Sequence, residues 1–263
     1  MKIFQSLWAY RAFILGSIKR EFQLKYRNSL LGGAWTILNP LAMILVYMVV
    51  FSKVMAAKLP GVEGTFSYGI YLCSGVLIWN FFAEIMNRSQ NMFLDNANIL
   101  KKLSFPRICL PVIIVGSAAL NFFIIFSLFT IFLLATNSFP GIFYLAVFPL
   151  IGILILFAIG LGIISGVLNV FFRDIGQFFA IFLQFWFWLT PVVYPISIIP
   201  DRLRVFIQLN PMTSLIESFQ TIFVQNHWPD WGSLWVVTML AILFGFLGFN
   251  LFRRHSGDMV DEL

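Results

Sequence analysis

Residues 142–171 read IFYLAVFPLIGILILFAIGLGIISGVLNVF, thirty consecutive positions without one charged side chain. About 20 apolar residues in a helix are enough to cross the hydrocarbon core of a bilayer. A longer run can tilt or bend and still remain within lipid. The stretch therefore predicts a membrane-spanning helix, and the rest of the chain has to be interpreted as part of a membrane protein.

The composition of the whole chain agrees with this interpretation. Of its 263 residues 60% are hydrophobic and only 11% are charged, and the mean hydropathy is +0.91. Soluble chains carry roughly 25% charged residues, so a soluble globular protein is excluded. We expect an all-α integral membrane protein with one transmembrane domain over residues 35–252. Six spans are predicted, at residues 35–54, 68–87, 112–136, 142–171, 175–194 and 234–252.

The positions of lysine and arginine predict the orientation. Thirteen of them fall before the first span, between spans two and three, after span four or after span six, and four fall on the other side. Cytoplasmic loops carry the excess of positive charge, so both termini and residues 1–34, 88–111 and 253–263 are predicted to be cytoplasmic. We expect no cleaved signal peptide. The net charge of +6 is explained by topology and by contact with anionic membrane lipids, and no nucleic-acid partner is expected.

Three segments outside the spans are amphipathic. In the first, six apolar side chains share one arc at helical spacing: Leu7, Trp8, Ile14, Leu15, Ile18 and Phe22. They predict a helix in the cytoplasmic interface, and a helix that simply continues into the first span is the alternative. The loop 88–111 is too apolar for free exposure, so it either docks on a partner or folds against the headgroups. Between spans five and six, residues 200–209 and 210–224 predict two short re-entrant or surface-lying helices, the second with Asn210 as N-cap and Pro211 after it.

Several kinds of chemistry are absent from the sequence. There is no Gly-Lys pair and so no phosphate-binding P-loop, and no Gly-x-Ser-x-Gly or His-Glu-x-x-His motif. The two cysteines and two histidines have no metal-ligand spacing. Ionisable residues lie at or beyond the span ends, which disfavours an ion-coupled transporter. We therefore expect no catalytic residue, no metal and no cofactor.

Polar groups and aromatic rings at membrane depth leave two interpretations open. The polar residues are Asn80, Asn121, Asn169, Gln184 and Thr190, and the rings gather in residues 178–188. Amides and ring faces suit a sugar-like solute, but phenylalanine that faces lipid is the simpler explanation of the rings. Within the fourth span, Ala158, Gly162 and Gly166 at a spacing of four predict a close approach of another helix.

Short motifs then resemble one family. The motifs are residues 25–32 (KYRNSLLG) followed by Trp35, Asn39-Pro40, residues 105–107 (FPR) with Leu110-Pro111, residues 169–174 (NVFFRD), residues 190–195 (TPVVYP) and residues 210–212 (NPM). In this order, from about Arg20 to Arg254, they resemble the ABC-2 type permeases that export polysaccharides. Two positions depart from that pattern: Glu21, where such permeases often have Asp, and Phe219-Gln220, where they often have Tyr-Arg. A role for that arginine is therefore not carried over.

The resemblance implies a transport role. It implies a separate ATPase subunit as partner, with two permeases and two ATPases in one exporter, and a lipid-linked polysaccharide (O-antigen, capsule or teichoic acid) as substrate in the bacterial inner membrane. It implies ATPase coupling by Asn98, Leu103, Phe105, Pro106 and Arg107, a place at the interface helix and the start of the first span for Arg20, Tyr26, Arg27 and Trp35, and a substrate path along Phe178, Phe182, Phe185, Trp186, Thr190 and Tyr194. The alternatives are an ABC-2 permease for a small drug or lipid and a non-transport membrane protein of envelope synthesis.

Overall fold

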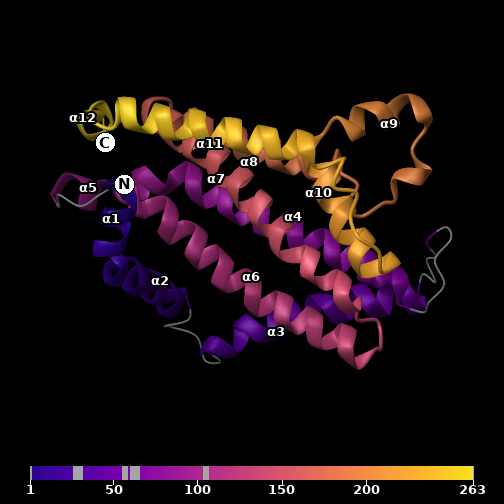
Figure 1. Cartoon of the computed structure of the whole chain (residues 1–263). Coiled ribbons are helices and arrows are strands. Elements are labelled where there is room, and N and C mark those ends of the chain that lie inside the picture. Colours follow the sequence, from indigo (N-terminus) through magenta and orange to yellow (C-terminus); the bar gives the residue numbers. More distant parts are fainter. Residues whose placement is uncertain (1, 26–31, 55–58, 60–65, 103–106, 263) are drawn as a thin grey trace.

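The computed structural model describes residues 2–25, 32–54, 59, 66–102 and 107–262. Within these ranges all regular secondary structure is helical (Figure 1). The expected all-α fold is therefore confirmed. Five described helical segments are long and apolar enough to cross a membrane: Gly32–Phe51, Ser67–Asp95, Cys109–Ala135, Gly141–Phe171 and Trp235–His255.

The helices follow one another with few long connections. The long ones are α3 (Trp35–Val46) with its π-helical continuation η2 (Tyr47–Val54), α4 (Ser67–Asp95), α6 (Cys109–Ala135), α7 (Val147–Phe171) preceded by η3 (Gly141–Ala146), and α11 (Trp235–His255). The short ones are α1 (Lys2–Ala9), α2 (Arg11–Lys25), η1 (Gly32–Ala34), α5 (Ala97–Lys102), α8 (Asp174–Trp188), η4 (Ile196–Ile198), α9 (Asp201–Gln208), α10 (Pro211–Gln220), η5 (Thr221–Gln225) and α12 (Asp258–Glu262). Both termini lie at one end of the molecule, together with α1 and α5, and α9 lies at the other end (Figure 1).

The predicted fifth span is the element that differs most from expectation. Residues 175–194 were expected to cross as one helix, but α8 ends at Trp188 after 15 residues. At 1.5 Å per residue it is about 22 Å long, which is shorter than the ~30 Å hydrocarbon core. The chain then turns through residues 189–195 and η4. The count of six spans therefore stays a prediction.

Helix α4 occupies the centre of the bundle. Every residue from Gly69 to Trp79 is buried, and the helix packs against α6, α7, α8 and α10. It continues to Asp95 without interruption, whereas the sequence predicted a span ending at residue 87. The first part of the predicted loop 88–111 is thus helical, because Arg88 to Asp95 still carries an apolar face that packs on α7.

Small residues on α7 let it approach both α4 and α11 closely. A Cβ atom at Gly162 would lie 2.5 Å from the Cβ of Ser89 on α4. On another face of α7, a Cβ at Gly160 would lie 2.6 Å from the backbone nitrogen of Gly245 on α11. The predicted approach at Gly162 is confirmed, and the contact between Gly160 and Gly245 was not anticipated.

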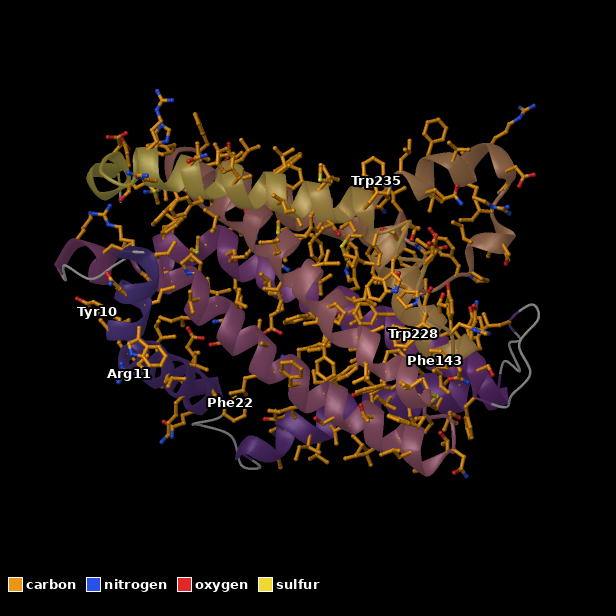
Figure 2. The ribbon with its side chains drawn as sticks, in the orientation of Figure 1. Tyr10, Arg11, Phe22, Phe143, Trp228 and Trp235 are labelled. Carbon is orange, nitrogen blue, oxygen red and sulfur yellow. The ribbon has the colours of Figure 1, made fainter. Side chains whose placement is uncertain are left out.

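The N-terminal amphipathic segment forms two helices, α1 and α2. Ile14 is 7% exposed and packs against Cys109 and Ile113 of α6, with Leu7 and Ile18 beside them. Figure 2 shows this region, with Tyr10, Arg11 and Phe22, at the opposite end of the molecule from Phe143 and Trp228.

Two side chains assigned to the same arc point elsewhere. Trp8 is 71% and Leu15 66% exposed, so the buried stripe of this segment is narrower than predicted. The guanidinium of Arg11 lies over the exposed ring of Trp8, with its Cζ atom 4.9 Å from the ring centroid. The same guanidinium donates a hydrogen bond to the Trp8 carbonyl at 2.9 Å. The segment therefore presents one face to α6 and a second, aromatic face away from the protein.

Candidate functional site

The predicted coupling residues lie at the end of the molecule that holds both termini. Asn98 on α5 is exposed, whereas Leu100 is buried in a cluster with Met92 and Met259. Arg107 donates from Nη1 to the Ser256 hydroxyl at 2.8 Å, which ties this segment to the C-terminal end of the chain. Three of the predicted residues, Leu103, Phe105 and Pro106, lie outside the described residues.

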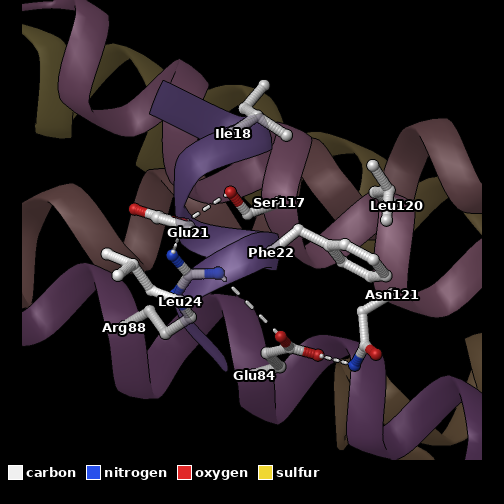
Figure 3. Close-up of a pocket in the computed structure, with 9 residues that line it drawn as sticks. All are labelled: Ile18, Glu21, Phe22, Leu24, Glu84, Arg88, Ser117, Leu120 and Asn121. Carbon is white, nitrogen blue, oxygen red and sulfur yellow. Dashed lines mark hydrogen bonds and ion pairs between the residues drawn. The ribbon is translucent and has the colours of Figure 1, made fainter. Parts of the chain in front are cut away.

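An ion-pair network joins α2 to the centre of the bundle. The guanidinium of Arg88 on α4 pairs with Glu21 on α2 at 2.5 Å and lies 3.9 Å from Glu84, one turn earlier. The Ser117 hydroxyl of α6 donates to Glu21 at 2.6 Å, and the Asn121 amide donates to Glu84 at 2.9 Å. Figure 3 shows these groups converging from three helices. One arginine between two carboxylates thus holds α2 against α4.

Two cavities meet at this network. The first, of about 380 Å³, is lined by Ile18, Glu21, Phe22, Leu24, Glu84, Arg88, Ser117, Leu120 and Asn121 (Figure 3). The second, of about 530 Å³, is lined by Trp35, Thr36, Asn39, Pro40, Met43, Leu77, Asn80, Phe81, Glu84, Asn121, Phe122 and Ile125. Glu84 and Asn121 line both, so their hydrogen bond lies at the boundary between them.

The structure describes two of the four residues predicted at the interface helix and the start of the first span. Arg20 is exposed on α2, and Trp35 is 39% exposed at the start of α3, where it lines the second cavity. Tyr26 and Arg27 fall outside the described residues. The part of this group that the structure describes therefore does not form one cluster.

The residues predicted to line a substrate path do not share one surface. Phe178, Phe182 and Phe185 on α8 are 60%, 40% and 66% exposed. Trp186 is less exposed: its ring lies against that of Phe182, with centroids 5.1 Å apart, and its indole nitrogen donates to Asn210 Oδ1 at 2.8 Å. Three of the rings are therefore exposed, and the fourth is partly buried beside one of them and held by a hydrogen bond.

The other two predicted path residues fasten the end of α8. The Thr190 hydroxyl donates to the Trp186 carbonyl and accepts from Asn210 Nδ2, each at 2.8 Å. The Tyr194 hydroxyl donates to the Trp188 carbonyl at 2.7 Å. Asn210 also caps α10 by accepting from the Met212 nitrogen, as the sequence predicted. These contacts stop α8 and connect it directly to α10.

Side chains of α4 and α10 donate hydrogen bonds to four successive backbone carbonyls of the turn over residues 190–195. The bonds run from Tyr68 Oη to Val193 O (3.1 Å), from Tyr71 Oη to Tyr194 O (2.8 Å), and from Gln220 Nε2 to Pro191 O (3.2 Å) and Val192 O (3.4 Å). Tyr68 and Tyr71 belong to α4, and Gln220 belongs to α10. The 190–195 turn therefore cannot move without α4 and α10 unless these bonds break.

Glycine lets the 190–195 turn approach α4. A Cβ atom at Gly75 would lie 2.8 Å from the Val192 carbonyl oxygen and 3.0 Å from Gln220 Nε2. Both distances are too short for a side chain, so residue 75 has to be glycine for this packing.

A third cavity, of about 340 Å³, lies beside the 190–195 turn. Its lining includes Tyr71, Ser197, Glu217, Gln220 and Gln225. Burial raises the pKa of the Glu217 carboxyl above its ordinary value of 4.5, because the charged form loses hydration there.

The comparison with known proteins decides the family. A model of the ABC-2 type transporter family matches residues 14–224. The chain belongs to this family. It is 28% identical to the O-antigen export system permease protein RfbA of Myxococcus xanthus, over 100% of both chains. It is 29% identical to a Klebsiella pneumoniae protein of the same name, over 89% of this chain and 88% of that one. The polysialic acid transport protein KpsM of Escherichia coli is 22% identical over 92% of each chain.

Sequence reasoning missed two sets of contacts in this ABC-2 transporter chain: the ion pair between Arg88 and Glu21, and the side chains that bind the 190–195 turn. Helical spacing relates Arg88 only to Glu84, four residues earlier, but the shorter contact of Arg88 is to Glu21, 67 positions earlier. Gln220 was noted only as a departure from the family pattern, although it binds the 190–195 turn. Tyr68 and Tyr71 carried no signal, because tyrosine near a span end is expected in any membrane protein.

The described part of this ABC-2 transporter chain offers no metal-binding group. Among those residues no set of three His, Cys, Asp or Glu side chains gathers in one place. Cys73 and Cys109 are unpaired, and both are 0% exposed.

Proposed function

We propose that this chain is the permease subunit of an ATP-driven exporter that moves lipid-linked polysaccharide, of O-antigen, capsule or teichoic-acid type, across the bacterial inner membrane. The observation that carries the proposal is the match along the whole chain to proteins named as O-antigen export permeases. The more distant likeness to a polysialic acid transport protein extends the same substrate class to capsules.

Energy comes from a separate ATPase subunit, with two permeases and two ATPases in one complex. The sequence has no phosphate-binding loop of its own, so the permease is not an enzyme. The coupling segment around Asn98 to Arg107 is the contact with the ATPase. Two observations support this: α5 exposes Asn98 and Lys101 near the ends of the chain, and its buried Leu100 packs the short helix against the bundle.

Both termini and the coupling segment face the cytoplasm. The distribution of lysine and arginine supports this orientation, and so does the placement of the two termini at one end of the molecule (Figure 1). Helices α9 and α10, with the 190–195 turn, then lie on the periplasmic side.

The exposed face of α8 is part of the path for the polymer. Phe178, Phe182 and Phe185 give it ring surface on which the C–H faces of sugars can stack. Lipid is the competing neighbour for this face, so the assignment depends on the experiment described in the Discussion.

Deletion of the gene in the source organism tests the proposal. We expect surface polysaccharide to be lost while lipid-linked polymer accumulates inside the cell, and a plasmid copy to restore export. Loss of polymer synthesis itself would support a role in envelope synthesis instead. In the purified complex, stimulation of ATP hydrolysis by a drug or simple lipid but not by a lipid-linked glycan would favour a different ABC-2 permease.

A further inference from the structure

The first membrane helix diverges from α4 along the cavity of about 530 Å³. Helix α3 packs against α6, and only its continuation η2 packs against α4. Pro40 lies within α3, where it removes one backbone donor. The result is a wedge-shaped space between α3, α4 and α6, which we call the α3 wedge, lined by the residues of the second cavity described above.

Amide side chains from three helices line the α3 wedge. Asn39 comes from α3, Asn80 from α4 and Asn121 from α6. Asn80 is the one exposed residue between Gly69 and Phe82 on a helix that is otherwise buried there. Neither Asn39 nor Asn80 has a side-chain hydrogen bond to another described residue. These amides are therefore free to bind an occupant.

The depth of the α3 wedge makes a polar occupant necessary. Asn80 lies near the middle of α4, a helix long enough to span the bilayer. An amide that faces hydrocarbon without a hydrogen bond costs several kcal/mol. Water or a polar ligand has to fill the space, and a volume of about 530 Å³ is in the range of ordinary small-molecule sites.

The charge of the lining selects against an anion. Among the residues that the structure describes, no lysine or arginine lines the second cavity, and Glu84 contributes a carboxylate at its boundary. Arg88 belongs to the first cavity, where Glu21 and Glu84 already pair with it. A phosphate group would thus meet a net negative environment. Amides, by contrast, both donate to and accept from hydroxyl groups, and the half-exposed ring of Trp35 provides a face for sugar C–H groups.

We propose that the α3 wedge is a binding site for a sugar ring of the exported glycan. Asn39, Asn80 and Asn121 bind its hydroxyl groups, and Trp35 stacks against the ring. The proposal rests on the proposed function, which supplies the glycan. It adds a location within one protomer, separate from the exposed rings of α8.

Cysteine protection tests the site, because Cys73 and Cys109 are 0% exposed and give little background. Asn80→Cys is labelled with a water-soluble maleimide in the permease–ATPase complex in lipid nanodiscs. We expect a polyprenyl diphosphate that carries a short hexose chain to slow labelling about tenfold at a concentration that occupies about nine-tenths of the sites. The same carrier without sugar should not slow it. Asp201→Cys on α9, outside the spans and the cavity and with a 93% exposed wild-type side chain, is the control and should be labelled equally with either probe.

The other outcomes overturn the proposal. Equal protection by the carrier without sugar would make the α3 wedge a lipid site. Protection by neither probe would show that the α3 wedge binds neither of them. No labelling of Asn80→Cys at all would show that the α3 wedge is closed to water. If the glycosylated carrier still stimulates ATP hydrolysis in these cases, the export function stands and only the site fails. If it neither stimulates hydrolysis nor protects, the proposed function fails too.

Affinity measurements on alanine variants give an independent test. Asn39→Ala and Asn80→Ala remove amides that bind no other described residue, so we expect the fold to be retained. Each should weaken binding of the glycosylated carrier about tenfold, as the loss of ~1.4 kcal/mol implies. Ser127→Ala is the control and should bind the carrier as tightly as the wild type does. Unaltered affinity in both wedge variants would contradict the assignment.

Discussion

Tyr71 of α4 donates its hydroxyl hydrogen to the backbone carbonyl of Tyr194 across 2.8 Å, joining residues 123 positions apart. The Pro191 carbonyl lies 3.2 Å from the same hydroxyl. Tyr71 is only 7% exposed, so water does not readily replace it. The phenol thus supplies polar partners for a turn whose own backbone makes few hydrogen bonds.

Removal of this hydroxyl should loosen the 190–195 turn. In Tyr71→Phe the ring remains but buried carbonyls lose their partner, which costs about 1–3 kcal/mol. We expect a lower unfolding temperature in detergent and reduced export. Tyr47→Phe is the control, since that hydroxyl has no hydrogen bond to another described residue. Equal stability of the two variants would contradict the role given to Tyr71.

The contact between α7 and α11 should not tolerate a methyl group. Gly160→Ala places a Cβ 2.6 Å from the Gly245 nitrogen, and such overpacking costs about 1–3 kcal/mol. Gly152→Ala, on the same helix, meets nothing within 4 Å and should be neutral or slightly stabilising. Thermal unfolding of both purified variants gives the comparison. A Gly160→Ala protein as stable as Gly152→Ala would show that the helices can separate freely.

Glu217 should make stability fall as the pH rises. Because burial raises its pKa in the folded chain, the folded state holds the proton more tightly than the unfolded state. Its contribution is fully present below the ordinary value of 4.5 and is lost as the pH rises through the raised pKa. Glu217→Gln should therefore be more stable than the wild type near neutral pH and match it at acidic pH. Asp201→Asn, which alters a carboxylate with a 93% exposed side chain, is the control and should change the pH profile much less.

Cysteine labelling in whole cells should report the orientation. We expect cysteines at residues 137–141 and near Pro200 to react with an impermeant maleimide from outside, and Lys101→Cys to react only after permeabilisation. The wild-type chain should remain unlabelled, since both native thiols are buried. Labelling of Lys101→Cys in intact cells would reverse the orientation inferred from the basic residues.

The two faces of α8 should differ in export. Phe182→Ala and Phe185→Ala remove exposed rings, so they should reduce surface polysaccharide without lowering the membrane level of the permease. Trp186→Phe removes the hydrogen bond to Asn210 and should lower the level itself. If export in the two phenylalanine variants stays normal, these rings face lipid and the path lies elsewhere.

The coupling segment should tolerate little charge. Leu103→Asp with Phe105→Asp would bury unpaired carboxylates in the contact with the ATPase. We expect normal membrane insertion but loss of co-purification with the ATPase and loss of export. Lys101→Asp, at an exposed position of α5, tests whether charge alone is responsible. Normal co-purification and export in the double variant would remove the coupling assignment.

Elements that depend on local pattern were predictable. Apolar runs located the long helices to within a few residues, apart from the end of α4, because burial in lipid or protein needs continuous hydrophobicity. Asn210 and Pro211 identified the start of α10 through capping chemistry. Glycines at a spacing of four identified one close helix contact, since only a missing Cβ permits it.

Elements that depend on distant residues were not predictable. The end of α8 at Trp188 is set by Thr190 and Asn210, and no hydropathy pattern reveals that contact. The resemblance implied a substrate path along six residues, but tertiary packing partly buries Trp186 and gives its indole a partner in Asn210. For the same reason the amides of Asn80 and Asn121, known from sequence only as polar groups at depth, could not be assigned to one cavity.

The crowding around Gly75 constrains how this protein can diverge. A side chain at position 75 would collide with the Val192 carbonyl and with Gln220 Nε2. Replacement of Gln220 by a longer arginine, as in many permeases that the sequence resembles, needs additional room at the same point. Substitutions at positions 75, 192 and 220 should consequently be inherited together, so that homologues which change one of them carry compensating changes at the other two.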